Sequence, residues 1–339
     1  MTDCKVSVVI PIYNAGQHLG ECLDSVLGQT LKDIEVLCVD DGSTDSSAKI
    51  LAGYAAKDAR VKVFSQPNAG PGAARNRALD AATGENVVFI DPDDYYPSCH
   101  VLEMLHDALS KSGCPMSAGK IFRVPESDPR AVKYNADYGR LRAYPHGGLL
   151  TLDEFQTPFR YSCYMFRRSL LDEAGIRFPL WRRFQDPLFL ARALVAGGRL
   201  FALDEFVYCY RLPKTPTRVD WDANDCARLR EFVKAYDELL SFAVEHGCRK
   251  MFVETAVVLG HERRFHGISA SHPMWGEFCR IVRDIRRPGF MRVRDWMLLF
   301  GRFWDDGALK RHGLVIARMV GPWAALKLYL WRLVNWRRG

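Results

Sequence analysis

The sequence lacks several features that mark common protein classes. None of its ten cysteines lies three residues from another, so a zinc ribbon or a thioredoxin-type site is not expected. Cys22 and Cys38 fall in apolar patterns, as buried free thiols do, and we expect a reducing, cytoplasmic environment. No uncharged apolar run reaches the roughly 18 residues of a membrane-spanning helix. A strand pattern follows the first five residues, so no signal peptide is expected.

Two glycine-rich phosphate-binding motifs are also missing. No Gly-x-x-x-x-Gly-Lys-Ser/Thr sequence occurs, which excludes a P-loop. No Gly-x-Gly-x-x-Gly follows the first predicted strand, which disfavours a dinucleotide site. A sugar nucleotidyltransferase would carry a glycine-rich, basic phosphate loop at that place, where this chain has Tyr13-Asn14-Ala15-Gly16. That enzyme class is therefore disfavoured.

Positive charge is concentrated at the C-terminal end. Residues 280–339 hold 14 Lys or Arg and 4 Asp or Glu, a net charge of +10, whereas the other 279 residues have a net charge of −3. Five of the eight Trp residues also lie in 280–339. A basic, Trp-rich helical segment suits an anionic membrane surface, although a helical cap or a contact in a homo-oligomer fits the same pattern. No nucleic-acid-binding module is present, so nucleic acid is not an expected partner.

Apolar runs alternate with helical periodicity through the first ninety residues. Strands are predicted at 6–14, 34–39, 61–64 and 87–90, and helices are predicted between them, the first with its apolar stripe over 19–27. Strands and helices alternating at this spacing predict right-handed βαβ units and a parallel sheet. Fully apolar strands are typical of a sheet that is covered on both faces.

Polar residues lie at the ends of three of these strands. The first strand ends in Tyr13-Asn14, Asp40-Asp41 follows the second, and Asp91-Pro92-Asp93-Asp94 follows the fourth. The carboxyl ends of parallel strands meet at one edge, where open α/β sheets bind ligands. Crowded carboxylates repel one another unless a cation neutralises them, and all-oxygen ligation favours Mg²⁺ or Mn²⁺. An acidic turn before a helix N-terminus is the alternative.

A glycine-rich segment leads into the third predicted helix. Gly70-Pro71-Gly72 lets the backbone approach a ligand closely, and a simple helix-start loop is the alternative. Arg75 lies near the start of the helix, where it can either meet a phosphate or hold one of the carboxylates.

Five segments in this order, across roughly residues 5–215, resemble the family 2 inverting glycosyltransferases of GT-A fold. They are Pro11-x-Tyr13-Asn14, Ser25-Val26-Leu27-x-Gln29-Thr30, Val39-Asp40-Asp41-Gly42-Ser43-x-Asp45, Asn68-x-Gly70-x-x-x-Ala74-Arg75-Asn76 and Asp91-x-Asp93-Asp94. The resemblance implies a Rossmann-like, mostly parallel sheet in a catalytic domain of residues 1–215, followed by a helical region at 216–339. It also implies a nucleotide-sugar donor, expected to be a UDP-sugar, and a divalent metal.

The resemblance assigns roles to individual residues. Asp41 is expected to contact the base, Asp91 the ribose, and Asp93, with Asp91 beside it, the metal that bridges the diphosphate. The full set expected at the donor is Pro11, Tyr13, Asn14, Asp40, Asp41, Asn68, Gly70, Arg75, Asp91 and Arg211.

The rest of the expected catalytic domain has weaker patterns. A helix is predicted at 98–112, a strand at 116–121, a return to the sheet at 161–166 and a helix at 169–174. Residues 125–160 have poor periodicity, and we expect a long, partly mobile segment on the acceptor side. An edge strand at 206–211 ends in Arg211 and resembles the Tyr-x-Tyr-Arg that closes the domain in the family.

Asp186 is the expected catalytic residue. It precedes Pro187 and an apolar helical face, so capping of that helix alone explains it. The alternative is a general base that takes a proton from the acceptor hydroxyl. Members of the family commonly have Glu-Asp here, whereas this chain has Gln185-Asp186.

Together these features predict a metal-dependent inverting transferase that moves a sugar to a hydroxyl of a polysaccharide or lipid-linked glycan. We expect it at the cytoplasmic face of a membrane, held peripherally by the C-terminal helices. These helices are predicted at 223–246, 250–266, 275–286, 290–304, 308–320 and 322–337. A catalytically lapsed nucleotide-sugar-binding subunit is the alternative, and Gln185 is the residue that favours it.

Overall fold

The computed structural model describes residues 4–126, 133–134, 144–212, 226–261, 274 and 276–277. The chain divides into two compact units, residues 1–219 and 220–339. The predicted boundary at residue 215, the predicted helices beyond residue 290 and the Trp-rich tail lie outside the described residues. In the second unit the structure describes α7 (Cys226–Glu245) and α8 (Arg249–His261), close to the first two helices predicted there.

The first unit alternates strands and helices, as predicted. Its strands are β1 (Val6–Ile12), β2 (Ile34–Asp40), β3 (Val61–Ser65), β4 (Asn86–Phe89), β5 (Met116–Pro125), β6 (Lys133–Tyr134), β7 (Gly148–Thr151), β8 (Tyr164–Arg167) and β9 (Arg199–Leu212). Its α-helices are α1 (Leu19–Leu27), α2 (Ser47–Ala55), α3 (Pro71–Ala81), α4 (Val101–Ser112), α5 (Arg168–Glu173) and α6 (Asp186–Gly197), with a short 3₁₀ helix, η1, at Tyr161–Cys163.

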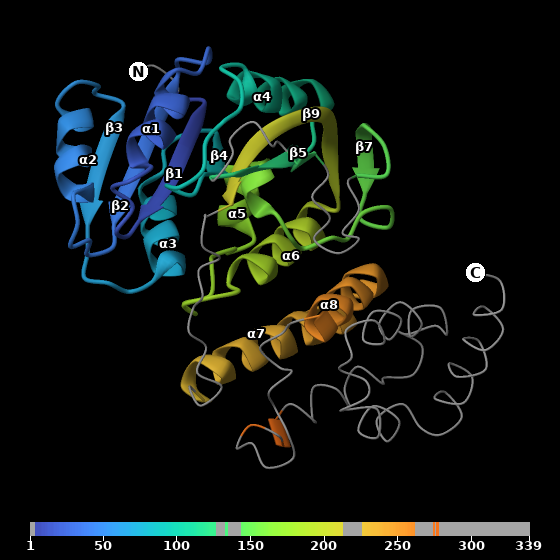
Figure 1. Ribbon diagram of the computed structural model, residues 1–339. Coiled ribbons are helices and arrows are strands. Elements are labelled where there is room, and N and C mark those ends of the chain that lie inside the picture. The colour runs from blue at the N-terminus through green and yellow to red at the C-terminus, as the bar shows by residue number, and fades with distance from the viewer. Residues whose placement is uncertain are drawn as a thin grey trace, which may run out of the picture. The chain divides into compact units, whose positions relative to one another are not determined.

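All the strands belong to one mixed sheet in the order β3-β2-β1-β4-β8-β5-β9-β7, with β6 paired to β5 (Figure 1). β1 is parallel to both β2 and β4, so the three polar strand ends do share one edge. β8 then runs antiparallel to β4 and β5. The predicted parallel arrangement therefore holds for β1 to β4, and the sheet as a whole is mixed. Helices α4 and α6 lie on opposite sides of β5 and β9 (Figure 1).

The core follows the apolar patterns of the sequence. Every residue of β1 and β2 is buried, as expected for strands covered on both faces. An aromatic cluster then joins β4 to α6: the rings of Phe178 and Phe189 stack with centroids 3.8 Å apart, and Phe89 meets each edge-on. This packing fixes the start of α6 beside the end of β4.

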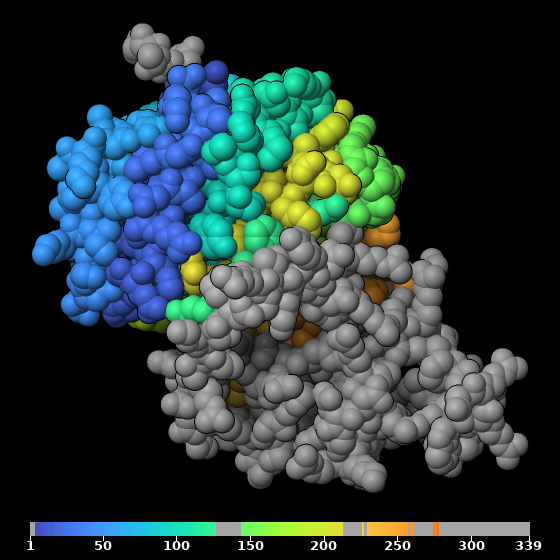
Figure 2. Space-filling view, turned by 45° about the horizontal axis from the view of Figure 1, so that its top comes forward, coloured from blue at the N-terminus to red at the C-terminus, as the bar shows by residue number. Residues whose placement is uncertain are grey.

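The second half of the sheet differs from the prediction in two places. β9 begins at Arg199 rather than near residue 206. The charged pair Asp204-Glu205 interrupts its apolar pattern, and a register shift against β5 accommodates that pair. β7 forms inside the segment expected to be a long loop, and it pairs with the first residues of β9. On the surface, yellow residues around β9 lie between teal residues around α4 and the light green of β7 (Figure 2).

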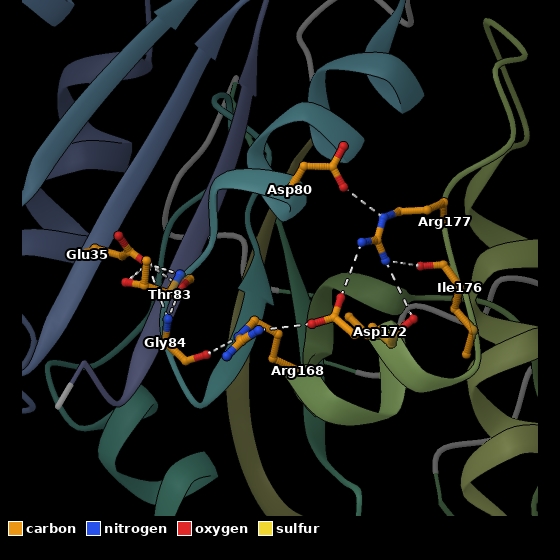
Figure 3. Close-up of polar contacts among 10 residues, drawn as sticks. Glu35, Asp80, Thr83, Gly84, Arg168, Asp172, Ile176 and Arg177 are labelled. Carbon is orange, nitrogen blue, oxygen red and sulfur yellow. Dashed lines mark hydrogen bonds and ion pairs between the residues drawn. The ribbon is translucent and has the colours of Figure 1, made fainter.

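A polar network joins the elements at the amino ends of the central strands (Figure 3). The buried Glu35 carboxylate accepts hydrogen bonds from the hydroxyl of Ser7 at 2.6 Å, the amide of Thr83 at 2.7 Å and the ammonium of Lys62 at 2.7 Å. Next to it, Arg168 donates to the carbonyl of Gly84. This edge of the sheet is thus held by hydrogen bonds, which leaves the opposite, carboxyl edge for a ligand.

From Arg168 a chain of ion pairs continues across the surface. Arg168 pairs with Asp172 at 2.9 Å, and Arg177 then bridges Asp172 and Asp80 (Figure 3). These contacts join α5 to α3 and support the segment that leads toward α6.

Candidate active site

The ends of β1 and β2 are tied together by Asn14. Its backbone φ is 49°, a left-handed conformation that Asn tolerates. The backbone amide of Asn14 donates to the hydroxyl of Ser43 at 3.0 Å, and its side-chain oxygen accepts from the amide of Thr44 at 2.8 Å. These bonds leave Tyr13 exposed at the rim of the edge, where an aromatic ring can stack on a nucleobase.

Asp41 organises the glycine-rich segment. One carboxylate oxygen accepts from the amide of Ala69 and from Gln66, and the other accepts from the amide of Gly70 at 2.8 Å. Gly70 has a φ of 94°, which a residue with a side chain rarely adopts. Asp40 likewise accepts from the backbone amide of Ser43. Both carboxylates are buried, so the structure uses them to shape the loops that surround the edge.

The turn after β4 carries the acidic cluster, and its members are not equivalent. The carboxylate of Asp94 is buried and accepts from the hydroxyl of Tyr208 at 2.7 Å and from the amide of Arg211 at 2.8 Å. The same Tyr208 hydroxyl accepts from the amide of Asp91. Asp94 therefore anchors the turn to β9, and the side chains of Asp91 and Asp93 remain for other partners.

Arg75 holds Asp91, which is the second of the two roles that its position allowed. Its Nη2 lies 2.7 Å from Oδ1 of Asp91, and the hydroxyl of Tyr161 donates to the same oxygen at 3.1 Å. The guanidinium lies over the rings of Tyr161 and Phe178. It is buried, and its Nε and Nη1 have no hydrogen-bond partner. A buried cation with two unused donors suits a polar ligand at this place.

Asp186 is the first residue of α6. The N-cap is Gln185, so the expected N-cap role of Asp186 is wrong by one position, because Gln185 already has helical dihedral angles. Desolvation raises the pKa of Asp186 to about 6, although the nearby charge of Arg75 opposes that rise. A carboxylate with a pKa near neutrality matches the requirements of a general base.

The segment before α6 is fixed against α3. Asn76 forms two hydrogen bonds of 2.8 Å with the backbone of Phe178. A Cβ on Gly72 would lie 2.4 Å from the carbonyl oxygen of Pro179, so only glycine allows this approach. The helix that carries Arg75 therefore also determines where Asp186 begins α6. Gln185 is buried beside it, with a side-chain oxygen that has no hydrogen-bond partner.

Asp91 and Asp93 fit a divalent cation, but they supply only some of the ligands that such an ion needs. Desolvation, and after it the charge of Asp91, raise the pKa of Asp93, and a bound cation would favour the ionised form of this carboxyl. No group of three or more His, Cys, Asp or Glu able to hold a metal occurs in the described part of the chain. A hard cation here would take Asp93 and Asp91 from the protein, and phosphate oxygens and water for the rest.

The structure thus brings most of the predicted residues to one edge and adds others. Tyr161, Tyr208 and Asn76 hold the turn and the start of α6, and none of them was expected at the site from the sequence. The sequence contained two signals for this group, since Asn76 ends the fourth segment of the resemblance and Tyr208 begins the Tyr-x-Tyr-Arg pattern, but neither residue had a predicted role. The side chain of Arg211 contacts Glu21 and the turn after β4, so its expected contact with the donor stays a prediction.

Comparisons with known proteins agree with this fold. Residues 7–175, about half of the chain, match the family model described as "Glycosyl transferase family 2". The uncharacterized glycosyltransferase EpsJ of Bacillus subtilis is 34% identical over 210 residues, which are 61% of this chain and 60% of the relative. The poly(ribitol-phosphate) beta-glucosyltransferase of Bacillus spizizenii is 48% identical over 216 residues, 61% of this chain and 32% of the relative. The chain spans less than two thirds of the length of these relatives.

Solved structures show the same fold at low identity. TarS 1–349 of S. aureus in complex with UDP-GlcNAc has a TM-score of 0.65 at 22% identity, covering 88% of this chain and 85% of that one. The mannosyltransferase PcManGT of Pyrobaculum calidifontis, in complex with GDP-Man and Mn²⁺, has a TM-score of 0.53 at 20% identity, covering 90% and 88%. The mixed sheet described above is therefore the GT-A arrangement.

Proposed function

Because this chain belongs to glycosyl transferase family 2, we propose that it moves a sugar from a nucleotide diphosphate sugar to a hydroxyl of a glycan acceptor, with inversion at C1. The observation that carries this proposal is the position of Asp186. Asp186 is the first residue of α6, and its pKa is raised to about 6. The charge of Arg75, which also pairs with Asp91, acts on Asp186 as well. A base and the expected donor residues thus share one sheet edge.

The proposed reaction is a single displacement. Asp186 takes the proton of the acceptor hydroxyl while that oxygen forms a bond to C1 of the sugar. The bond from C1 to the diphosphate oxygen breaks, and the nucleoside diphosphate leaves with the electron pair. Asp91 and Asp93 would hold a Mg²⁺ or Mn²⁺ ion, which would stabilise the charge that develops on the leaving diphosphate.

The donor site is proposed for a UDP-sugar. TarS was solved with UDP and UDP-GlcNAc and PcManGT with GDP-Man, so the fold accommodates more than one base. The proposed acceptor is a cell-envelope polysaccharide or a lipid-linked glycan. One relative is named for a poly(ribitol-phosphate) acceptor, and that name supports a polymeric acceptor with free hydroxyls.

A membrane position is a separate proposal that rests on the basic, Trp-rich residues 280–339. In the described part of the chain, no helix is long and apolar enough to cross a bilayer. We propose peripheral attachment at the cytoplasmic face, with homo-oligomers as an alternative use of the same segment. Truncation after residue 285 should release the protein from vesicles that contain anionic lipid, and unchanged partitioning would contradict attachment.

The central test is sugar transfer from a donor panel of UDP-glucose, UDP-N-acetylglucosamine and GDP-mannose in the presence of Mn²⁺. Asp186→Asn and Asp93→Ala should each strongly lower the rate of transfer that the wild type performs. Asp107→Asn, an exposed change on α4, is the matched control. Equal transfer by wild type, Asp186→Asn and Asp93→Ala would contradict the assigned roles. Nucleotide binding without turnover across the panel would favour the lapsed binding subunit.

A further inference from the structure

Arg211, near the end of β9, directs its contacts at the turn Asp91–Asp94. Its backbone amide donates to Oδ1 of Asp94 at 2.8 Å, and its Nε donates to the carbonyl oxygen of Asp93 at 2.9 Å. The guanidinium lies over the ring of Tyr95, 5.2 Å from its centroid. The side chain is only 12% exposed. One arginine therefore contacts two residues of the turn, Asp93 and Asp94, and the residue that follows it, Tyr95.

The guanidinium is itself held by a third element. Nη2 of Arg211 lies 2.6 Å from Oε2 of Glu21, which is in the first turn of α1. A planar guanidinium with donors on two sides keeps a fixed orientation when both sides are bonded. Glu21 thus aims Nε of Arg211 at the Asp93 carbonyl.

The contacts at the two ends of the turn are reciprocal. From the turn, the Asp94 carboxylate accepts hydrogen bonds from the hydroxyl of Tyr208 and from the backbone amide of Arg211, both on β9. From β9, the Tyr208 hydroxyl accepts a hydrogen bond from the Asp91 amide, and Nε of Arg211 donates one to the carbonyl oxygen of Asp93. The backbone on both sides of Pro92 is therefore fixed. The Asp93 carboxylate remains for a ligand, together with Oδ2 of Asp91, whose Oδ1 is bonded to Arg75 and Tyr161.

We propose that Arg211 is a positioning residue that sets the Asp93 carboxylate for a divalent cation, with Glu21 holding the guanidinium in place. The proposal rests on the proposed function, in which this turn binds the metal of the donor complex. It differs from the expectation that Arg211 meets the diphosphate, because Nε and Nη2 of Arg211 are already bonded to the Asp93 carbonyl oxygen and to Glu21. Outer groups that orient a ligating residue commonly change metal affinity tenfold to a hundredfold.

The test measures metal binding without turnover. The dissociation constant of Mn²⁺ is measured by electron paramagnetic resonance in the presence of saturating UDP, for wild type and for Arg211→Gln. We expect binding about tenfold to a hundredfold weaker in the variant. In EDTA, the dissociation constant of UDP should stay within about twofold of the wild-type value, because the proposed role acts through the metal ligand.

The chain offers a matched control and a second variant. Arg167 on β8 also donates to two backbone carbonyls, those of Cys114 and Leu109, and pairs with a glutamate, Glu85. Arg167→Gln loses bonds of the same kind away from the turn, so its Mn²⁺ affinity should equal that of the wild type. Glu21→Gln, a change at a half-exposed side chain, should weaken Mn²⁺ binding in the same direction by a smaller factor, and it covers the case in which Arg211→Gln unfolds.

The outcomes distinguish a failure of the proposed function from a failure of the positioning role of Arg211. If the wild type binds UDP but no Mn²⁺, the metal-dependent function fails and the positioning role falls with it. If the wild type binds both while Arg211→Gln and Glu21→Gln leave the Mn²⁺ affinity unchanged, only the positioning role is overturned. If Arg211→Gln weakens UDP equally with and without metal, Arg211 contacts the diphosphate directly, which also overturns the positioning role.

Discussion

Nη2 of Arg75 lies 2.7 Å from Oδ1 of Asp91, and this ion pair joins the two sides of the proposed reaction. Asp91 belongs to the turn expected to meet the donor. The same guanidinium also lowers the pKa of Asp186, the proposed base on the acceptor side, against the effect of burial. A single buried cation therefore influences both the donor carboxylate and the base.

Asp186→Asn is expected to lower kcat by about a hundredfold to ten-thousandfold, the usual contribution of a general base. UDP affinity should stay within about twofold, because the change leaves the expected donor residues in place. Stability should not fall: the pKa of Asp186 is raised to about 6, so its ionised form is disfavoured in the folded state. Removing that charge should raise the free energy of unfolding at pH 7.5 by at most about 3 kcal/mol.

Steady-state kinetics, nucleotide titration and urea denaturation measure these three quantities. Asp107→Asn serves as the control for the loss of an aspartate. A large loss of both stability and UDP affinity in Asp186→Asn would show a structural role for this residue.

The pH dependence of kcat/KM should show an acid limb near pH 6. Asp186 accepts a proton only when it is ionised, so activity should rise as the pH increases through about 6 and then level off. The contribution of Asp186 to stability changes with pH in the opposite direction. Between the ordinary aspartate pKa of about 4 and about 6, the folded state binds more protons, so the contribution of Asp186 to stability falls as the pH rises. A limb centred below pH 5 would contradict this assignment.

Arg75→Gln should move that acid limb to higher pH. Without the guanidinium, Asp186 loses a nearby positive charge that lowers its pKa, and we expect that pKa to rise by about one unit. The variant also leaves Asp91 without its ion-pair partner, which should cost up to about 3 kcal/mol of stability because Asp91 is partly exposed. Arg167→Gln is the control: it loses comparable hydrogen bonds, and its pH profile should match that of the wild type.

The sequence predicts the first half of the fold well because that half is built from local units. The apolar runs of β1 and β2 and the stripe of α1 identify these elements, and parallel pairing then brings Asn14, Asp41 and Asp91 to one edge. The same reasoning cannot find Tyr161 or Tyr208. Each is an aromatic residue in an apolar pattern, and its hydrogen bond to the acidic turn spans 70 or 114 residues of sequence.

The second half is less predictable for a related reason. β7 and the first part of β9 have mixed polar and apolar residues, and they become strands only by pairing with each other and with β5. Likewise, the sequence shows three aspartates after β4 without saying which of them is structural. Asp94 is distinguished only by its burial against Tyr208 and Arg211.

Gly72→Ala is expected to impair catalysis through the backbone. An added Cβ would lie 2.4 Å from the carbonyl oxygen of Pro179, so the segment that leads to Asp186 must move away from α3. We expect kcat to fall at least about tenfold, since small displacements of a catalytic group are costly. Gly53→Ala on α2, where an added Cβ meets no atom within 4 Å, should leave kcat unchanged. Equal kinetics in the two variants would show that this close approach does not position Asp186.

Glu35→Gln tests the network at the amino ends of the central strands, on the edge of the sheet opposite the candidate site. This network is expected to stabilise the fold without taking part in catalysis. Burial would raise the pKa of Glu35, but hydrogen bonds from Lys62, Ser7 and Thr83 hold it at about 2. We expect the variant to lose about 2 kcal/mol at pH 7, allowing for the partial exposure of Lys62.

The sign of the pH effect separates this carboxylate from Asp186. A depressed pKa stabilises the folded state above the ordinary glutamate value of 4.5, and that stabilisation is lost as the pH falls toward 2. The difference in unfolding free energy between wild type and Glu35→Gln should therefore shrink between pH 4.5 and pH 2. Glu85→Gln, at a more exposed ion pair, should show little difference at either pH. A gap between wild type and Glu35→Gln that stays constant down to pH 2 would contradict a contribution from the ionised carboxylate, because Glu35 would then stabilise the fold equally well when protonated.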